Sequence, residues 1–493
     1  MYRDVTIEEL DKFMQKSRAA FHSYRKLSLK QRADFMREIA HQLQVSEAEL
    51  IVIAARETNL TEARLRGELK RTIFQLTSYA AACEKGDWLD IRIDTGIADK
   101  TPPKPDLRKM LIPLGPVAVF GAANFPFAYS TAGGDTACAL AAGCPVIVKA
   151  HPAHAGTGEK VAEAIHKAIK INHLPDGVFT HIHGVSFSVG KALVEHPLVK
   201  AVGFTGSLAG GKQLFDWANQ RKEPIPVFAE MSSTNPVFLL PEKLKNEPEA
   251  IANMYADSIT LGVGQFCTNP GLIIGIESPE LDDFEKILAS KIEKSVPETM
   301  LHQGISKNYF EKRADTLAQP EVRIIAVSEI SAKENLAVAS IAETKAENFI
   351  KNPILHKEVF GPFSLIIKCT DISQMAEVAL HIGGQLTATI MATDDDIMSY
   401  PELIEDIKNL CGRFILNGVP TGVEVCLSMQ HGGPFPATTD SRFTAVGADG
   451  IRRFSRPIAF QNWSNDLLPD ELKNENPLGI WRTVNNELTK ESV

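Results

Sequence analysis

The sequence predicts an α/β protein with two mainly parallel sheets, the first of them in a dinucleotide-binding domain. Short apolar runs alternate with longer amphipathic stretches, which is the pattern of strands joined by helical crossovers. A chain of 493 residues is also longer than one hydrophobic core normally organises. We therefore expect two or three domains with a large buried core.

The first series of apolar runs predicts a doubly wound, Rossmann-type sheet. Helices are expected at 157–171 and 189–195, between the strands. The expected strands are 117–120, 146–150, 178–183, 201–204 and 226–229. Strands that alternate with helices in this way form the parallel sheet of a dinucleotide-binding domain.

A second α/β series begins near residue 235 and predicts another sheet. One helix is expected at 247–261. The expected strands are 236–240, 272–275, 364–368, 386–391 and 413–416. The pattern alone places the boundary between the two series near residue 231.

Composition and charge exclude several classes of protein. The 52 Lys and Arg against 61 Asp and Glu give a net charge of −9, which does not favour binding to nucleic acid or to an anionic membrane. The most apolar stretches, 111–129 and 137–148, are interrupted by Pro and Gly and so do not predict a membrane helix. No signal peptide is recognised at the N-terminus, and we expect a cytoplasmic protein.

One of the seven cysteines is a candidate nucleophile. The cysteines include no C-x-x-C pair, so neither a disulfide framework nor a structural zinc site is expected. Cys267 follows a glycine-spaced stretch, 262–266, and precedes Thr268 and Asn269. A flexible, polar approach of this kind suits a reactive thiol, whereas the general alternative for a lone cysteine is an inert, buried thiol.

A glycine turn after an expected strand is a candidate phosphate site. Within residues 200–212, Gly206, Gly210 and Gly211 permit a tight turn into a helix, and Ser207 adds a hydroxyl. The first amides of such a helix are free to bind an anion. The pattern differs from the strict G-x-G-x-x-G fingerprint, so an ordinary strand-to-helix turn is the alternative.

Two histidine pairs are candidate metal ligands. His151 and His154 lie at the end of one expected strand, and His181 and His183 alternate along another. Neither pair has a third ligand nearby in the sequence. The sequence therefore predicts no metal.

Several short segments occur in an order that resembles the aldehyde dehydrogenase family over nearly the whole chain. The matching segments are Asn124-Phe125-Pro126, Lys149, Phe204-Thr205-Gly206-Ser207, Glu230, Cys267 and Glu358-Val359-Phe360-Gly361-Pro362. The resemblance implies a fold with a Rossmann-type cofactor domain, an α/β catalytic domain and a small oligomerisation arm. The corresponding expected ranges are 1–230, including an inserted or flanking oligomerisation segment, then 231–425, and 426–493 as a C-terminal closing or oligomerisation arm.

The same resemblance implies NAD(P)-dependent oxidation of an aldehyde to a carboxylate. Cys267 would attack the carbonyl and form a thioester, Asn124 and the Cys267 backbone N–H would stabilise the oxyanion, and Glu230 would activate water. His431 is a further catalytic candidate, because a histidine at this place in related enzymes lies near the thiol, although it could instead only shape a loop.

The resemblance also assigns the cofactor site. Its expected members include Lys149 and the turn residues Gly206, Ser207 and Gly211. Glu358 and Phe360 would orient the ribose and the nicotinamide ring.

Two departures from the family pattern change these expectations. Met231-Ser232-Ser233 replaces the usual Leu-Gly-Gly after the general base, which restricts the backbone there. Pro152 occupies the position of a glutamate that binds the adenosine ribose in NAD-preferring members. No carboxylate is then present to repel a 2′-phosphate, and Lys149 and His151 would attract it, so we expect NADP, with NAD possible.

Finer similarities indicate a subgroup and a substrate. Residues 115–158, 417–425 and 431–435 most resemble α-ketoglutarate semialdehyde (2,5-dioxopentanoate) dehydrogenases together with an NADP-dependent fatty aldehyde dehydrogenase. The favoured reaction is α-ketoglutarate semialdehyde to 2-oxoglutarate, and the alternative substrate is a long-chain aldehyde. Arg71 is the candidate anchor for a substrate carboxylate, with an ordinary surface arginine as the alternative.

Other classes of function remain as alternatives. Gln265 before Cys267, with His431 as a base, suggests a cysteine hydrolase or amidase, but the local signature of such enzymes is absent. A CoA-acylating dehydrogenase and an inactive binding protein are less consistent with the retention of Glu230. The resemblance implies a small-molecule aldehyde as substrate and a homodimer or homotetramer as the assembly.

Overall fold

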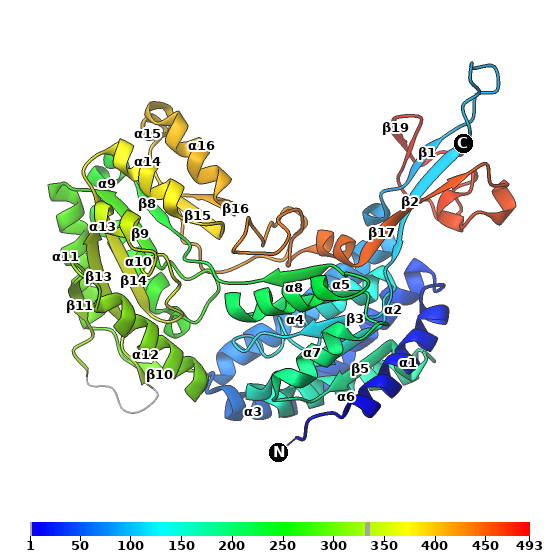
Figure 1. The fold of residues 1–493 in the computed structure, drawn as a ribbon, viewed down its shortest axis with the longest axis horizontal. Helices are drawn as coiled ribbons and strands as arrows, with labels where there is room; N and C mark the ends of the chain where they lie inside the picture. Colours follow the sequence, from blue (N-terminus) through cyan, green and yellow to red (C-terminus); the bar gives the residue numbers. More distant parts are fainter. Residues whose placement is uncertain (1, 331–335) are drawn as a thin grey trace.

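A computed structural model describes residues 2–330 and 336–493 of the chain. It consists of two α/β bodies that lie side by side and a narrow sheet that projects from them (Figure 1). The predicted α/β fold class is confirmed. Within these residues, no helix has both the length and the apolar character needed to cross a membrane.

Four helices precede the first sheet. They are α1 (Ile7–Tyr24), α2 (Leu29–Val45), α3 (Glu47–Thr58) and α4 (Glu62–Lys85). α1 begins at a capping box, in which the Thr6 hydroxyl accepts from Glu9 N and the Glu9 side chain accepts from Thr6 N. α4 buries Leu65, Leu69 and Leu76 in the core and extends toward the junction of the two bodies.

The first body contains the predicted Rossmann-type sheet, in the strand order β5-β4-β3-β6-β7, with all neighbours parallel. Its strands are β3 (Val117–Phe120), β4 (Val146–Lys149), β5 (Phe179–Ile182), β6 (Ala201–Thr205) and β7 (Val227–Glu230). Its helices are α5 (Gly134–Ala142), α6 (Ala155–Ile171), α7 (Phe187–Glu195) and α8 (Leu208–Gln220). The predicted strands of this sheet are confirmed to within one or two residues at each end.

The second body contains a seven-stranded sheet in the order β11-β13-β14-β9-β8-β15-β16. Its strands are β8 (Val237–Leu239), β9 (Leu272–Ile276), β11 (Arg323–Val327), β13 (Ser340–Lys345), β14 (Phe363–Cys369), β15 (Gln385–Met391) and β16 (Cys411–Leu416). Its longer helices are α10 (Pro248–Thr260), α11 (Pro279–Glu293), α12 (Gln303–Leu317), α14 (Ile372–His381) and α16 (Pro401–Asn409). The sequence missed β11 and β13.

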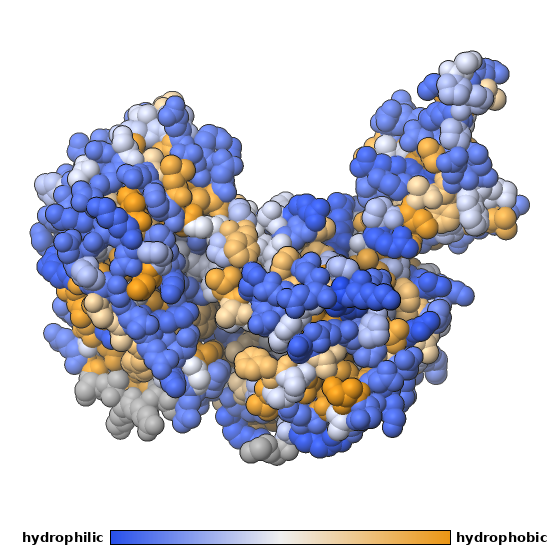
Figure 2. Space-filling model, in the orientation of Figure 1, coloured by the Kyte–Doolittle hydropathy of each residue, from blue (hydrophilic) through white to orange (hydrophobic). Residues whose placement is uncertain are grey.

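The projecting sheet joins segments from both ends of the chain. Its order is β17-β2-β1-β18-β19, from β1 (Arg92–Asp94), β2 (Leu107–Pro113), β17 (Ser455–Gln461), β18 (Arg482–Val484) and β19 (Glu487–Thr489). It stands clear of the two bodies, and hydrophobic side chains appear on its surface in Figure 2. Exposed residues of this region include Trp463, Leu467, Trp481 and Leu488.

Residues 431–439, here called the bridging segment, bind both bodies. Met231 N donates to Ala437 O at 2.7 Å, and Thr439 N donates to Ala229 O at 3.1 Å, so the segment continues the first sheet beyond β7. On its other side, Gly384 N donates to Phe435 O at 3.1 Å, directly before β15. A Cβ at Gly384 would overlap the carbonyl of the bridging segment, so this approach requires glycine.

Candidate active site

The nucleophile candidate Cys267 follows a sharp turn after α10. The short 3-10 segment η4 (Leu261–Gly264) contains three residues in the left-handed region, Gly262, Val263 and Gly264, with φ of 53°, 60° and 61°. Left-handed geometry is costly for a β-branched residue such as Val263, so the surrounding packing must hold this turn in place. The turn ends the helix and leaves the Cys267 side chain half-buried at the junction of the two bodies.

Cys267, His431 and Glu230 converge although they come from different elements. His431 Nε2 lies 3.6 Å from Cys267 Sγ and 3.0 Å from Glu230 Oε1. The reactive atoms of all three residues lie within 4.8 Å of one another. A 3.0 Å contact between an imidazole nitrogen and a carboxylate oxygen requires a proton, so we assign the proton of His431 to Nε2.

The surroundings of Cys267 favour the protonated thiol. Burial raises the pKa of Cys267 well above its ordinary value, and the nearby Glu230 carboxylate raises it further. The sequence predicted an open, polar approach to the thiol, whereas the structure shows that burial also disfavours the thiolate. The thiol must lose its proton before the sulfur can react, because the thiolate is the nucleophile.

Asn124 contacts the backbone just before the nucleophile. It follows β3, is buried, and its Nδ2 donates to Gln265 O at 3.0 Å. A side-chain amide carries two N–H bonds, so a second donor remains for an oxyanion next to Cys267. Asn235 holds the same loop through its backbone carbonyls, because Asn235 Nδ2 donates to Cys267 O and Asn269 O, both at 2.9 Å.

Two charged residues of α4 hold the Asn124 loop, and the sequence analysis missed both. Arg64 Nη2 donates to Asn124 O at 3.0 Å, and its guanidinium lies 5.0 Å from the ring centres of both Phe125 and Phe266. Glu68 Oε1 accepts from the N–H groups of the two residues after Pro126, at 2.8 and 3.0 Å. Burial raises the pKa of Glu68 to about 7. A detectable signal was the position of Glu68 among the apolar residues of an amphipathic helix.

Arg71 follows on the same side of α4 and is half-buried, which does not fit the surface alternative. Its Nη1 donates to Val423 O, and its Nη2 donates to the Tyr129 hydroxyl at 3.2 Å. The ring centre of Tyr129 is 6.3 Å from that of His431. Arg71 is thus separated from the catalytic cluster by one side chain.

The residues expected to bind the adenosine half of the cofactor lie at the carboxyl ends of the first sheet. Lys149 ends β4, is half-buried, and has no hydrogen-bond or ion-pair partner among the residues that the structure describes. Burial lowers its pKa. An unpaired, half-buried ammonium group fits an anionic or hydroxyl-bearing ligand, so the residues present are compatible with NAD(P).

His151 and the start of α8 are the other expected members of the adenosine site. His151 Nδ1 accepts from Ala153 N at 3.2 Å, and burial lowers the pKa of His151 well below its ordinary value. The ring is therefore neutral, and His151 would contribute a hydrogen bond and no positive charge. At the start of α8, Ser207 caps the helix by accepting from Gly210 N at 3.2 Å, while Gly206 is exposed.

The residues expected to hold the nicotinamide half lie beside the nucleophile loop. Glu358 and Phe360 line a pocket together with Phe266, which directly precedes Cys267, and Asn269, which follows it by two positions. Burial raises the pKa of Glu358 to about 7. The structure thus brings the predicted nicotinamide-side residues next to the nucleophile loop. His181 on β5 and His183 directly after it belong to another part of the first body.

Residues 2–434 match the model of the Aldehyde dehydrogenase family. The chain belongs to this family. As an aldehyde dehydrogenase it is an oxidoreductase that oxidises aldehydes with NAD(P), and the cysteine hydrolase interpretation is not favoured.

Curated relatives cover nearly the full length of this aldehyde dehydrogenase. Alpha-ketoglutaric semialdehyde dehydrogenase 2 of Azospirillum brasilense is 47% identical over 475 residues, which are 96% of this chain and 90% of the relative. Alpha-ketoglutaric semialdehyde dehydrogenase of Acinetobacter baylyi is 46% identical over 494 residues, covering 99% of this chain and 93% of the relative.

Solved structures show the same fold at low sequence identity. A 3,6-anhydro-L-galactose dehydrogenase in complex with NAP superposes with a TM-score of 0.79 at 18% identity, covering 93% of this chain and 92% of that one. A 1-pyrroline-5-carboxylate dehydrogenase gives a TM-score of 0.77 at 19% identity, covering 93% and 86%.

The raised pKa of Cys267 leads to a test by alkylation. We expect iodoacetamide to modify Cys267 slowly at pH 7 and faster as the pH rises, because the thiolate is the reactive form. Glu230→Gln removes a charge that raises the thiol pKa and should accelerate the reaction at pH 7 by about threefold to tenfold. Mass spectrometry of the Cys267 peptide measures the rate, and exposed Cys426 in the same digest is the control. A slower reaction in Glu230→Gln would show that the carboxylate mainly activates the thiol.

Proposed function

We propose that this aldehyde dehydrogenase converts α-ketoglutaric semialdehyde to 2-oxoglutarate through a thioester on Cys267. The main support is the convergence of Cys267, Glu230 and Asn124 at the junction of the two sheets, where a carbonyl can be attacked and its oxyanion stabilised. The choice of aldehyde is supported by the names of the two relatives at 47% and 46% identity.

The first step requires an activated sulfur. The Cys267 thiol loses its proton to solvent, and the His431 Nε2–H group then donates to the thiolate. The sulfur attacks the aldehyde carbon, and the oxygen becomes an oxyanion. Asn124 Nδ2 and the Cys267 backbone N–H stabilise this charge, with a contribution of about 3 kcal/mol per donor.

The cofactor site supplies the oxidation. Lys149, Ser207 and Glu358 would hold the two halves of the dinucleotide, and Phe360 would pack beside the ring. A bound NAD(P) would supply the acceptor for the hydride that the carbon attached to Cys267 must lose. The carbon and sulfur remain joined as a thioester.

Hydrolysis completes the reaction. Glu230 Oε2 is buried and has no hydrogen-bond partner among the described residues, so it is free to accept a proton from a water molecule. The water oxygen attacks the thioester carbon, the C–S bond breaks, and Glu230 returns the proton to Cys267. The carboxylate product is then released.

Replacing the two main residues should separate the two half-reactions. We expect Cys267→Ala to lower turnover by about 1000-fold or more, because no thioester forms. Glu230→Gln should give one equivalent of reduced cofactor in a rapid burst and then a steady state slowed by roughly 100-fold. Stopped-flow absorbance of the reduced cofactor measures both phases. A steady-state rate in Glu230→Gln equal to wild type would exclude Glu230 from hydrolysis.

We also propose that Arg71 binds the carboxylate of the semialdehyde. Its Nε is buried and has no hydrogen-bond partner among the described residues, so the guanidinium still has a donor to offer. Tyr129 contacts Arg71 and has its ring centre 6.3 Å from that of His431, so the positive charge is one side chain away from the catalytic cluster. A long-chain aldehyde has no carboxylate for this group.

Substitution of Arg71 tests this assignment. Arg71→Met should raise KM for α-ketoglutaric semialdehyde by about tenfold to 100-fold and leave KM for uncharged butanal nearly unchanged, because only the first substrate carries a carboxylate. Steady-state kinetics with both aldehydes give the comparison. Arg66→Met is the matched control, since Arg66 is on the same helix but pairs with Glu47 and Glu62 at the surface. An equal loss for both aldehydes in Arg71→Met would contradict the assignment.

We further propose that NADP is the preferred cofactor. Pro152 begins the short 3-10 turn η2 (Pro152–His154), three residues after Lys149, so no carboxylate occupies the position that would repel a 2′-phosphate. Lys149 supplies the positive charge, whereas neutral His151 does not.

Introducing a carboxylate at this position tests the preference. Pro152→Glu should raise KM for NADP by about tenfold or more and affect KM for NAD much less, because a new negative charge lies near the 2′-phosphate. Initial rates with each nucleotide measure this ratio. Pro152→Gln has a side chain of the same size without the charge and should leave the ratio near that of wild type. A ratio that changes equally in both variants would contradict the proposal.

Assembly into a homodimer or homotetramer is proposed through the projecting sheet. Support comes from its separation from the two bodies and from exposed Trp463, Leu467, Trp481 and Leu488, which are large apolar residues of the kind that subunit contacts bury.

A further inference from the structure

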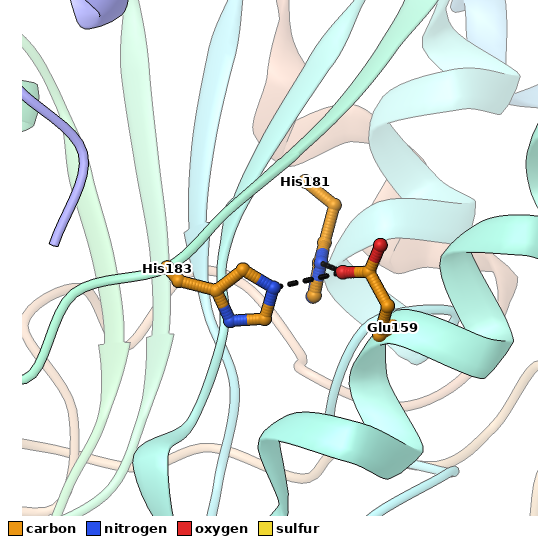
Figure 3. Close-up of side chains that lie close together, drawn as sticks. All are labelled: Glu159, His181 and His183. Atoms are coloured by element: carbon orange, nitrogen blue, oxygen red, sulfur yellow. Dashed lines mark hydrogen bonds and ion pairs between the residues drawn. The ribbon is translucent and has the colours of Figure 1, made fainter. Parts of the chain in front are cut away.

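A second cluster of titratable residues lies on the far edge of the first sheet. Glu159 belongs to α6, and His181 and His183 belong to β5 or directly follow it (Figure 3). His181 Nδ1 is 3.1 Å and His183 Nε2 is 2.8 Å from the same oxygen, Glu159 Oε2. β5 and β7 are the two opposite edges of this sheet, so the cluster is separate from the catalytic residue Glu230.

We propose that Glu159, His181 and His183 bind a divalent transition-metal ion, with Zn²⁺ as the type ion. Two imidazole nitrogens and one carboxylate oxygen are a donor set that this class of ion prefers. Water would complete the coordination. The sequence predicted no metal because the histidines lack a third ligand nearby in the chain, and Glu159 is 22 and 24 residues away from them.

The geometry of the cluster is close to that of a coordination shell. Ligand atoms about 2.0–2.1 Å from a tetrahedral ion are roughly 3.3 Å from one another. The two separations from Glu159 Oε2, 3.1 and 2.8 Å, are slightly shorter, and all three ligand atoms lie within 4.8 Å of one another. A small outward movement of the side chains would therefore admit the ion. His181 and His183 face the same side because residues two apart on a strand do so.

The second nitrogen of His181 adds an independent observation. His181 Nε2 and Thr131 Oγ1 are both buried without a hydrogen-bond partner among the described residues. Both lie 3.1 Å from the point that a Cβ at Gly158 would occupy, so they are neighbours. When Nδ1 binds a metal, the ring proton is on Nε2, and metal-bound histidines usually donate it to an adjacent acceptor. Thr131 Oγ1 is a neighbouring hydroxyl that would accept it after a small movement of the side chains.

Solvent can reach the cluster from one side. The side chains of Glu159 and His183 are 41% and 17% exposed, whereas that of His181 is 3% exposed. The ring of Tyr2 stacks on His183 with centres 4.0 Å apart, and Val5 N donates to His183 O at 3.0 Å. A bound ion would thus fasten α6 to β5 directly below the N-terminal segment.

A second group of potential ligands must be separated in the experiment. Glu230, Cys267 and His431 also bring a carboxylate, a thiol and an imidazole together. That group contains sulfur, and a cobalt–thiolate bond gives a strong near-ultraviolet charge-transfer band. Cys267→Ser removes this band and leaves the proposed site intact.

The test is a titration of the full-length Cys267→Ser chain with Co²⁺ after dialysis against a chelator. We expect one equivalent of Co²⁺ to bind, with visible d–d bands, no thiolate band, and displacement by Zn²⁺. His183→Ala and Glu159→Gln, each in the same background, should weaken Co²⁺ binding by at least about tenfold. His196→Ala is the matched control, because His196 pairs with Asp11 at 3.3 Å and the described residues supply no third ligand there.

Three results of this titration would overturn the proposed metal site. Failure of the Cys267→Ser chain to bind one equivalent overturns it, and so does equal affinity in Glu159→Gln. Glu159→Gln keeps the size of the side chain and one oxygen, so circular dichroism should show the wild-type fold. If His183→Ala does not fold, the Co²⁺ affinity of Glu159→Gln decides the proposal. Loss of affinity in His196→Ala equal to that in the cluster variants would indicate only adventitious binding by surface histidines and would also overturn the proposal.

Discussion

The contact between the bridging segment and the two sheets is the constraint on which the catalytic geometry depends. Residues 431–439 hydrogen-bond to Ala229 of β7 through Thr439, and to Gly384 beside β15 through Phe435. The same segment starts at His431, and β7 ends at Glu230. One stretch of chain therefore fixes the distance between the two bodies and places an imidazole between a carboxylate and the sulfur of Cys267.

Burial around this junction determines the charge states of its groups. Glu68 binds the loop that follows Asn124, Glu358 lines the pocket beside Phe266, and burial raises the pKa of each to about 7. A site with little water strengthens the attraction between an oxyanion and its donors. The same environment raises the pKa of Cys267, so the protein gains oxyanion stabilisation but holds a smaller fraction of the reactive thiolate at neutral pH.

Much of the fold could be predicted from local sequence, because apolar runs bounded by Gly and Pro mark strands wherever both faces are buried. β13 was missed since Glu343 and Lys345 interrupt its apolar pattern. The catalytic candidates came from the order of short motifs, but their contacts join residues up to 201 positions apart and need coordinates. Arg64 and Glu68 were missed because ionisable residues on a helix normally face solvent, and only tertiary packing turns this pair inward.

The projecting sheet has a consequence for synthesis of the chain. β2 pairs along its length with β17, which follows about 340 residues later. At ribosomal rates of roughly 5–20 residues per second, β2 waits on the order of 20 to 70 s for its partner. During that interval the nascent polypeptide has an unpaired edge that holdase chaperones can bind. Any surface that requires the completed sheet is thus available only on a finished chain, and truncated translation products lack it.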